Sequence, residues 1–276
     1  LRFYSYFLET SIIITTYNRP DALELVLLSA LNQTVLPSQV IVADDGSDDR
    51  TRQLVHRYEQ VSEIPISHVW QDDCGFRVAR IRNQALAQVK SPYVILVDGD
   101  ILMAPNFIED HLKLAKVGHF IQGGRVLLNQ ALTAKLLTES NQLRYPNMFQ
   151  AGFESGRFEK RISSFRNLLL ARWTAKNLAH KRSKVRSCNM SFYMRDVRAV
   201  NGFNNLFEGW GREDSEFVER LFNYGLKGQL IKFAAIGYHL YHKEASRKAL
   251  PQNDHLLEKT KLEKLTSCAD GLSSFL

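Results

Sequence analysis

Short apolar runs alternate with amphipathic stretches over the first hundred residues of the chain. The apolar, β-branched runs predict strands at residues 11–16, 39–43, 66–69 and 93–97. The stretches between them predict helices at residues 22–31, 50–60 and 77–89. Strands that are apolar along their whole length and are separated by helices indicate parallel βαβ units, with both sheet faces covered. We therefore expect an α/β fold with a Rossmann-like, mostly parallel central sheet flanked by helices.

The pattern is less regular in the second half. Further strands are predicted at residues 120–128, 191–194 and 230–236, with a helix at 217–224 and a helical tail after Pro251. Within residues 157–186, apolar side chains recur at roughly helical spacing, at Phe158, Ile162, Phe165, Leu169, Trp173 and Leu178. This spacing predicts a basic amphipathic helix or helix pair inserted into the α/β framework.

Charge is distributed unevenly along the chain. The formal net charge is +7, but residues 1–110 hold 9 Lys and Arg against 15 Asp and Glu, whereas residues 111–200 hold 17 against 4. Residues 157–186 alone hold 10 basic residues and one acid. A basic surface of this kind suits an anionic partner such as a nucleotide, a nucleic acid or a membrane. Apolar residues make up 45% of the chain, which argues against a disordered or low-complexity protein.

Cysteine usage and hydropathy indicate the compartment. The three cysteines, Cys74, Cys188 and Cys268, are odd in number and lack CxxC spacing, which argues against a disulfide framework and a cysteine zinc site. No apolar run reaches the roughly 18 residues that span a membrane. Residues 1–8 lack the features of a secretory signal. We expect a cytoplasmic protein, with peripheral contact at the inner face of the membrane.

Acidic side chains follow two of the predicted strands. Asp44 and Asp45 end the second strand, and Asp98-Gly99-Asp100 ends the fourth. Ligands bind beyond the carboxyl ends of parallel strands, and carboxylates spaced i, i+2 can converge on Mg²⁺ or Mn²⁺ shared with a phosphate. Gly99 allows a nucleotide to approach the backbone. The alternative is an ordinary turn, because Asp-Gly pairs are common in turns.

Two later motifs also carry candidate chemistry. In residues 209–214, GWGRED, a tryptophan between glycines can offer a platform for a sugar, and a carboxylate can accept a hydroxyl proton. The alternative is a solvated helix start, where acids are favoured. His239 and His242 suit a metal site, although spacing alone favours two members of an aromatic cluster with Tyr238 and Tyr241.

These stretches together resemble inverting nucleotide-sugar glycosyltransferases of the GT-A fold, in glycosyltransferase family 2, with a galactosyltransferase-type C-terminal segment similar to chondroitin and hyaluronan polymerase modules. The matching motifs are SIIITTYNRPD at 11–21, VIVADDGSD at 40–48, RNQA at 82–85, VILVDGD at 94–100, CNMSF at 188–192, VNGF at 200–203 and FEGWGREDSE at 207–216. The resemblance implies one continuous GT-A domain. Its expected parts are a nucleotide-sugar-binding half at 1–110, an acceptor-binding and catalytic half at 111–250, and a tail at 251–276.

The resemblance implies a role for each site residue. Asp100 would bind Mn²⁺ or Mg²⁺ together with His242, or with His239 in its place. An arginine among Arg77, Arg80 and Arg82 would face the diphosphate. The residues expected to contact the UDP-sugar donor are Thr15, Tyr17, Arg19, Asp44, Asp45, Arg77, Arg82, Asp98 and Gly99. Asp214 would be the catalytic base, assisted by Glu213, with Trp210, Gly211 and Glu213 contacting the acceptor.

The implied reaction moves galactose, GalNAc or GlcNAc from a UDP-sugar to a hydroxyl of a glycan or lipid-linked acceptor, in surface polysaccharide or lipopolysaccharide synthesis. One direct displacement, with Asp214 as base, would invert the anomeric carbon. A sugar-nucleotide pyrophosphorylase is a second interpretation, but it needs a glycine-rich basic loop where residues 15–20 read TTYNRP. A nucleic-acid-binding protein is a third, but the acidic strand ends would repel phosphates without a metal, so no nucleic-acid partner is expected. The basic segment 157–186 suits a solvated helical face, a membrane contact or a flap over the acceptor.

Overall fold

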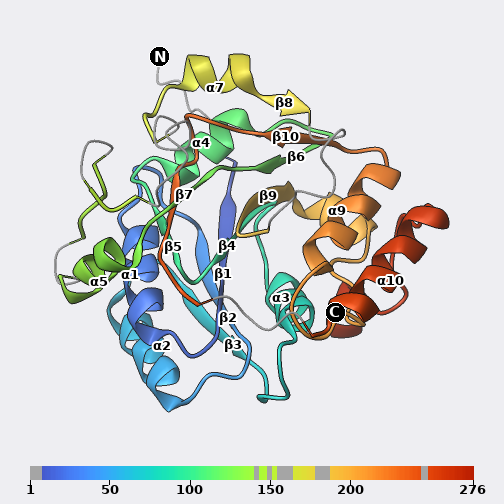
Figure 1. The fold of residues 1–276 in the computed structure, drawn as a ribbon, viewed down its shortest axis with the longest axis horizontal. Coiled ribbons are helices and arrows are strands. Elements are labelled where there is room, and N and C mark those ends of the chain that lie inside the picture. The colour runs from blue at the N-terminus through green and yellow to red at the C-terminus, as the bar shows by residue number, and fades with distance from the viewer. Residues whose placement is uncertain (1–7, 140–142, 148–150, 154–163, 178–186, 244–247) are drawn as a thin grey trace.

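A computed structural model describes residues 8–139, 143–147, 151–153, 164–177, 187–243 and 248–276. Its centre is an eight-stranded sheet in the order β3-β2-β1-β4-β9-β6-β10-β8, shown in Figure 1. These strands are β1 Thr10–Thr16, β2 Gln39–Asp44, β3 Ile66–Trp70, β4 Tyr93–Asp98, β6 His119–Gln122, β8 Lys176–Asn177, β9 Asn189–Tyr193 and β10 Lys227–Leu230. A second sheet, in the order β5-β11-β7, contains β5 Ile101–Met103, β7 Arg125–Leu127 and β11 Gly237–His239.

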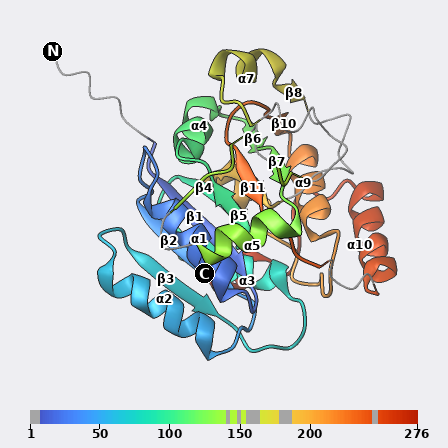
Figure 2. The same ribbon diagram turned by 60° about the vertical axis from the view of Figure 1, so that its left-hand side comes forward.

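Helices cover both faces of the central sheet (Figures 1 and 2). They are α1 Pro20–Leu31, α2 Asp49–Val61, α3 Val78–Ala87, α4 Phe107–Leu114, α5 Gln130–Thr138, α7 Leu168–Thr174, α8 Met194–Ala199, α9 Glu213–Asn223 and α10 Leu250–Leu262, followed by a 3₁₀ turn, η2 Leu272–Phe275. Ile12 and Ile14 of β1 pack with α1, α2 and α4, whereas Ile13 packs with α3, α8 and α9. The predicted parallel core is confirmed, because β1 pairs in parallel with both β2 and β4, and β2 with β3.

The second half departs from the predicted pattern in two places. Residues 120–128 form parts of two strands in different sheets, because β6 ends at Gln122 and β7 begins at Arg125. Gly123 and Gly124 lie between them, and Gly123 lies so close to Asn189 that a side chain would not fit. The strand predicted at 230–236 is wrong: β10 ends at Leu230 and β11 begins at Gly237. Phe233 and Ala235 between them have φ of 63° and 49°, which a strand does not accommodate. In addition, β9 runs antiparallel to both β4 and β6, so the sheet is mixed.

The basic segment is only partly helical where it is described. Residues 168–174 form α7 and residues 176–177 form β8, while residues 157–163 and 178–186 lie outside the described part. The spacing of Phe165, Leu169 and Trp173 predicted the apolar face of an amphipathic helix, and all three side chains are exposed. Instead Ala171 is fully buried, against Ile121, Ile231 and Ala234.

The C-terminal segment packs closely against the rest of the chain. The predicted helix after Pro251 is confirmed as α10, which contacts α9, and η2 contacts α3. The helix predicted at 217–224 begins four residues earlier, at Glu213, and Gly225 follows it with φ of 101°. Among the described residues, every helix is too short or too polar to cross a lipid bilayer.

Candidate active site

The acidic motif after β4 lies against the end of β1. Thr15 and Asp98 are paired in register, and the Gly99 N–H donates to the Thr15 carbonyl over 2.7 Å. A Cβ on Gly99 would lie 2.9 Å from that carbonyl oxygen. A glycine is therefore needed here for two chain segments to approach closely enough to place Asp98 and Asp100 at the sheet edge.

Arg82 connects this acidic motif to the start of α9. Its side chain is 4% exposed, and its Nη2 donates to Asp98 Oδ1 over 2.9 Å while its Nε donates to Thr15 Oγ1 over 3.2 Å. Its Nη1 lies 3.7 Å from Glu213 Oε1. The guanidinium therefore bridges two motifs that lie 115 positions apart in the numbering.

Among the three candidate arginines, only Arg82 reaches the acids. Arg77 donates its Nη2 to the Asp72 carbonyl over 2.5 Å, and Arg80 lies 5.2 Å from the centre of the Phe275 ring. Arg125, which sequence reasoning passed over, is a second cation near these acids. Its charge, like that of Arg82, opposes the rise that burial causes in the pKa of Asp98. Its position directly after Gly123 and Gly124 was the available signal.

Glu213 and Asp214 form the first turn of α9, and both are buried. Asp214 Oδ2 accepts the Ser187 N–H over 3.2 Å, and Oδ1 accepts the Ser215 hydroxyl over 3.2 Å. Burial, reinforced by the charge of Asp214, raises the pKa of Glu213 to about 7, against the opposing charge of Arg82. Two carboxyl groups therefore lie side by side, one with a raised pKa and one that accepts two hydrogen bonds. Carboxyl groups in contrasting surroundings are typical of sites that carry out acid–base chemistry.

Asp100, His239 and His242 come together as a cluster with metal-ligand chemistry. His242 Nε2 lies 3.2 Å from Asp100 Oδ2, and His239 Nε2 lies 3.7 Å from Asp100 Oδ1. The three ligand atoms lie within 4.8 Å of one another. Asp100 Oδ1 is buried without a hydrogen-bond partner, and burial raises the pKa of Asp100. A carboxylate and two imidazoles fit a divalent cation, and a bound cation would give the buried Asp100 Oδ1 a partner.

Strand pairing creates that cluster. His239 pairs with Ile101 in the small sheet, and the Leu240 N–H donates to the Asp100 carbonyl over 2.9 Å. Both histidines, predicted as alternatives for one ligand, therefore reach the same carboxylate.

The two acids after β2 hold neighbouring loops. Asp44 is fully buried and accepts the Ser47 N–H over 2.8 Å and His68 Nε2 at 2.9 Å. Asp45 accepts Gln71 Nε2 over 2.5 Å and the Arg77 N–H over 2.9 Å, and burial raises its pKa. Both carboxylates thus hold the loops that follow β2 and β3 in place through protein contacts.

Tyr17 and Arg19 lie in the turn between β1 and α1. The Tyr17 hydroxyl donates to Asp73 Oδ2 over 2.9 Å, and this bond raises the pKa of Tyr17. Arg19 donates to Asp21 over 3.1 Å, and its charge also acts on Asp100. These contacts leave the phenol face of Tyr17 half-exposed at the edge of the acidic site.

Asn83 and Gln84 follow Arg82 on α3, and no site role was predicted for either. Asn83 Nδ2 donates to the Phe203 carbonyl over 2.7 Å, and Asn83 Oδ1 accepts the Phe203 N–H over 2.8 Å. Gln84 donates to Gln71, the residue that bonds Asp45. Because consecutive helical residues point in different directions, α3 ties three loops of the site together.

The loop that carries Trp210 is held by the C-terminal helix. Asn253 of α10 donates to the Gly211 carbonyl over 2.8 Å and the Glu208 carbonyl over 3.1 Å. Gly209 and Gly211 have φ of 72° and 107°, conformations that suit glycine, and Trp210 is half-buried between them. Residues 251–276, predicted as a tail, thus support the loop, and no local signal in the sequence marks Asn253 for this role.

A buried hydrogen-bond chain supports the second half of the site. Asn189 Nδ2 donates to the carbonyls of Gly124 and Ala235 over 3.0 and 2.9 Å, so its Oδ1 must accept from His111 Nε2 at 2.9 Å. His111 Nδ1 therefore accepts the Ser191 hydroxyl at 2.8 Å. Burial lowers the pKa of His111 to about 4, which keeps it neutral. Through Gly124 and Ala235, these hydrogen bonds hold the segments that lead into Arg125 and His239.

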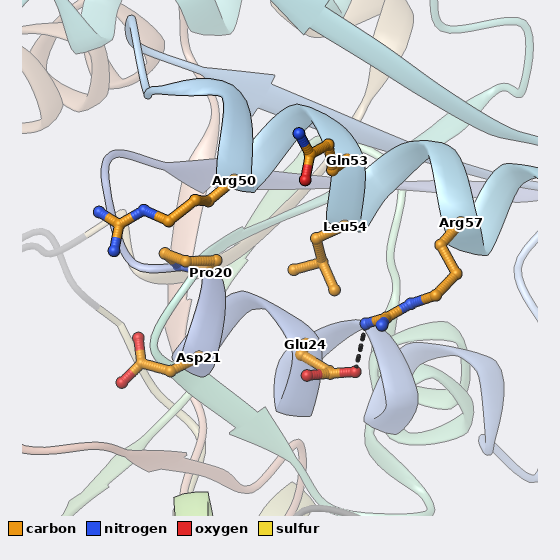
Figure 3. Close-up of a pocket in the computed structure, with 7 residues that line it drawn as sticks. All are labelled: Pro20, Asp21, Glu24, Arg50, Gln53, Leu54 and Arg57. Carbon is orange, nitrogen blue, oxygen red and sulfur yellow. Dashed lines mark hydrogen bonds and ion pairs between the residues drawn. The ribbon is translucent and has the colours of Figure 1, made fainter.

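A separate surface pocket lies between α1 and α2 (Figure 3). It has a volume of about 270 Å³ and is lined by Pro20, Asp21, Glu24, Arg50, Gln53, Leu54 and Arg57, none of which is a predicted site residue. Arg57 pairs with Glu24 over 2.7 Å, and Arg50 pairs with Asp48 over 2.7 Å. Its charges are already matched within the protein.

Comparison with known proteins identifies the relatives of this chain. A family model for glycosyl transferase family 2 matches residues 11–187, and one described as the N-terminal domain of galactosyltransferase matches residues 170–243. The hyaluronan synthase of Pasteurella multocida is 30% identical over 255 residues, covering 86% of this chain and 25% of that protein. Validoxylamine A glucosyltransferase of Streptomyces hygroscopicus subsp. limoneus is 29% identical over 226 residues, covering 78% and 48%. The chain thus spans between about a quarter and a half of these relatives' lengths.

Solved structures show the same architecture. A crystal structure of residues 1–349 of TarS from S. aureus has a TM-score of 0.62 and 16% identity, covering 93% of this chain and 65% of that one. The same fragment in complex with UDP has a TM-score of 0.62 and 18% identity, covering 92% and 65%. At these identities the likeness is one of fold.

Proposed function

Because the chain belongs to glycosyltransferase family 2 and has the GT-A fold, we propose that it is an inverting, metal-dependent transferase that uses a UDP-sugar. The observation that carries the proposal is that one buried arginine, Arg82, contacts both Asp98 of the first acidic motif and Glu213, the neighbour of Asp214. A donor site and a candidate base thus adjoin each other. The acceptor we propose is a hydroxyl of a glycan or lipid-linked oligosaccharide in surface polysaccharide or lipopolysaccharide synthesis, in line with the polysaccharide synthases among its relatives.

The proposed donor site lies between β1, β4 and the loop after β2. Thr15, Tyr17, Asp44 and Asp45 shape the part that would receive the nucleoside, and Gly99 leaves room beside the backbone. The remaining proposed donor contacts come from side chains that carry charge: Arg19, Arg77, Arg82 and Asp98, to which the structure adds Arg125. The donor sugar we propose is of the galactose, GalNAc or GlcNAc type.

Asp100, His239 and His242 are the residues that would hold the metal. Two imidazoles beside one carboxylate suit Mn²⁺ better than Mg²⁺, which prefers oxygen ligands. A divalent cation held there offsets the negative charge that the diphosphate gains as the glycosidic bond breaks.

Asp214 is the proposed base. Its carboxylate takes the proton of the acceptor hydroxyl while the hydroxyl oxygen attacks the anomeric carbon from the side opposite the diphosphate. Glu213 and Trp210, with Gly211, would orient the acceptor beside it. The Ser187 N–H and the Ser215 hydroxyl keep the Asp214 side chain in place.

Turnover of a UDP-sugar panel with Mn²⁺, Mg²⁺ or a chelator tests the proposal. We expect UDP release that requires the metal and is lost in Asp100→Asn and in His242→Ala, while the matched control His255→Ala, on α10, keeps it. Consumption of pyrophosphate would instead select the pyrophosphorylase. Metal-independent turnover equal in all variants would refute the metal assignment. The location we propose is cytoplasmic, at the inner face of the membrane.

A further inference from the structure

Four large apolar side chains around α7 face outward. Trp173 is 83% exposed, Leu169 77%, Phe165 56% and Leu170 39%. These four form what we term the α7 apolar face. They fall within nine residues, whereas the other 11 exposed large hydrophobic residues of the described chain are spread along the rest of it. Clustered exposed apolar side chains, unlike single ones, mark a surface that another body covers.

The exposure is not the result of a poorly anchored helix. Ala171 is fully buried against Ile121, Ile231 and Ala234, on the inner side of α7. The Asn167 N–H donates to the Phe233 carbonyl over 2.8 Å, and Asn167 Oδ1 caps the helix by accepting the Leu170 N–H over 3.0 Å. Within the part of the chain that the structure describes, the helix thus has a packed inner side and a second apolar side whose side chains are exposed.

An ion-pair anchor fixes the start of this helix to α4. Arg166 donates two bonds to Asp110 Oδ1, over 2.9 and 2.8 Å, and one to Glu109 over 2.9 Å. Asp110 in turn accepts the Ala235 N–H over 3.0 Å. In Figures 1 and 2, α7 and β8 lie at the outer edge of the sheet beyond β10, away from α3, α9 and α10. The helix that carries the apolar face is therefore anchored to α4 by ion pairs. It lies apart from α3 and α9, the elements that carry Arg82 and Asp214.

The sequence around the apolar face is strongly basic. Residues 160–186 contain nine Lys and Arg and neither Asp nor Glu. Arg172 lies within α7, and Lys176, three residues after Trp173 in the sequence, begins β8. Basic residues that flank exposed tryptophan and leucine are typical of segments lying in the headgroup region of an anionic bilayer.

We propose that the α7 apolar face, with Arg172 on the same helix and helped by the basic sequence around it, docks this protein on an anionic phospholipid surface, without crossing it. A bilayer uses both features, because Trp173 and Leu169 enter the interface while the cations meet lipid phosphates. A second copy of the chain, related by a two-fold axis, would bring two like-charged segments together. A purely anionic partner such as an acidic protein would leave the apolar side chains in water. The inference does not depend on which sugar is transferred.

Cosedimentation of the full chain with vesicles tests the proposal. We expect binding to vesicles of equal parts phosphatidylcholine and phosphatidylglycerol, weakening as salt rises, and little binding to phosphatidylcholine alone. Leu169→Ser with Trp173→Ser should lower the partition coefficient by about tenfold or more. Leu262→Ser is the matched control, since Leu262 is an equally exposed leucine on α10.

Three outcomes would overturn the proposal. They are equal vesicle binding by the double variant and the wild type, equal binding to neutral and anionic vesicles, or a dimer that depends on Leu169 and Trp173 in the absence of vesicle binding. Metal-dependent UDP release is measured on the same samples without vesicles, and the double variant should keep it. Loss of docking and failure of the proposed reaction are therefore distinguishable.

Discussion

Replacing Asp214 by asparagine removes the proposed base while keeping its surroundings. In the wild type, Asp214 Oδ2 accepts the Ser187 N–H and Oδ1 accepts the Ser215 hydroxyl. Asparagine can present its Oδ1 to the Ser187 N–H and donate its Nδ2 to Ser215 Oγ, because a hydroxyl also accepts. Both local bonds are kept, and the change is close to isosteric. The variant should therefore fold normally.

The expected loss concerns the chemical step. A positioned general base contributes about 10²- to 10⁴-fold in rate, which corresponds to about 3 to 5 kcal/mol of activation free energy. Binding of UDP with Mn²⁺ should change little, because Arg82 contacts Asp98 and Glu213 and not Asp214. Losing the charge of Asp214 should also lower the pKa of Glu213, since that charge contributes to its rise.

Initial rates of product formation by mass spectrometry, together with calorimetric titration of UDP and Mn²⁺, measure these effects separately. Ser215→Ala is the matched control, because it removes one bond to Asp214 and leaves the carboxylate ionisable. We expect kcat/KM to fall by at least about 100-fold in Asp214→Asn and by less than about tenfold in Ser215→Ala. Near-normal turnover in Asp214→Asn would refute the assignment. A loss of UDP binding in that variant would show that Asp214 acts on the donor.

Three further predictions concern pH and the support of the site. Folded Glu213 releases its proton near pH 7 and an unfolded glutamate near 4.5, so the folded state binds more protons in that window. As pH rises across it, the wild type should lose up to about 3 kcal/mol relative to Glu213→Gln in urea unfolding, and parallel curves would contradict this. His111 has the opposite sign, because its folded pKa is about 4 against 6.5 unfolded. Stability should therefore fall as pH drops from 6.5 to 4. If His111→Gln leaves the slope of unfolding free energy against pH unchanged, the role of His111 in the buried hydrogen-bond chain is contradicted. Asn253→Ala leaves two carbonyls near Trp210 without a donor, at about 1–3 kcal/mol each, so acceptor transfer should fall while UDP binding persists. The exposed neighbour Gln252→Ala is its control, and equal transfer rates in the two variants would contradict the role of Asn253.

Local patterns predicted the strands of the first half because a strand covered on both faces needs consecutive apolar residues, and such a run is visible in the sequence itself. Ile12, Ile13 and Ile14 are all buried, on alternating faces, as a continuous apolar run in a covered parallel sheet requires. The same reasoning was wrong at residues 230–236, where the positive φ of Phe233 and Ala235 interrupts an apolar run. In the basic segment the same reasoning predicted an amphipathic helix, but period alone did not say that Ala171 would be buried while Leu169 and Trp173 stay exposed.

The sequence by itself determined the parallel βαβ core, the acids that end β2 and β4, and, through the motifs, the family. The motifs already suggested one histidine beside Asp100. Only the tertiary structure decided that both His239 and His242 reach it. The structure also decided that Arg82 rather than Arg77 or Arg80 meets Asp98, and that Asn253 holds the Trp210 loop. The physical reason is that strand and helix signals arise from neighbours in the chain. A site depends instead on pairings such as β11 with β5, and these form only when the whole core packs.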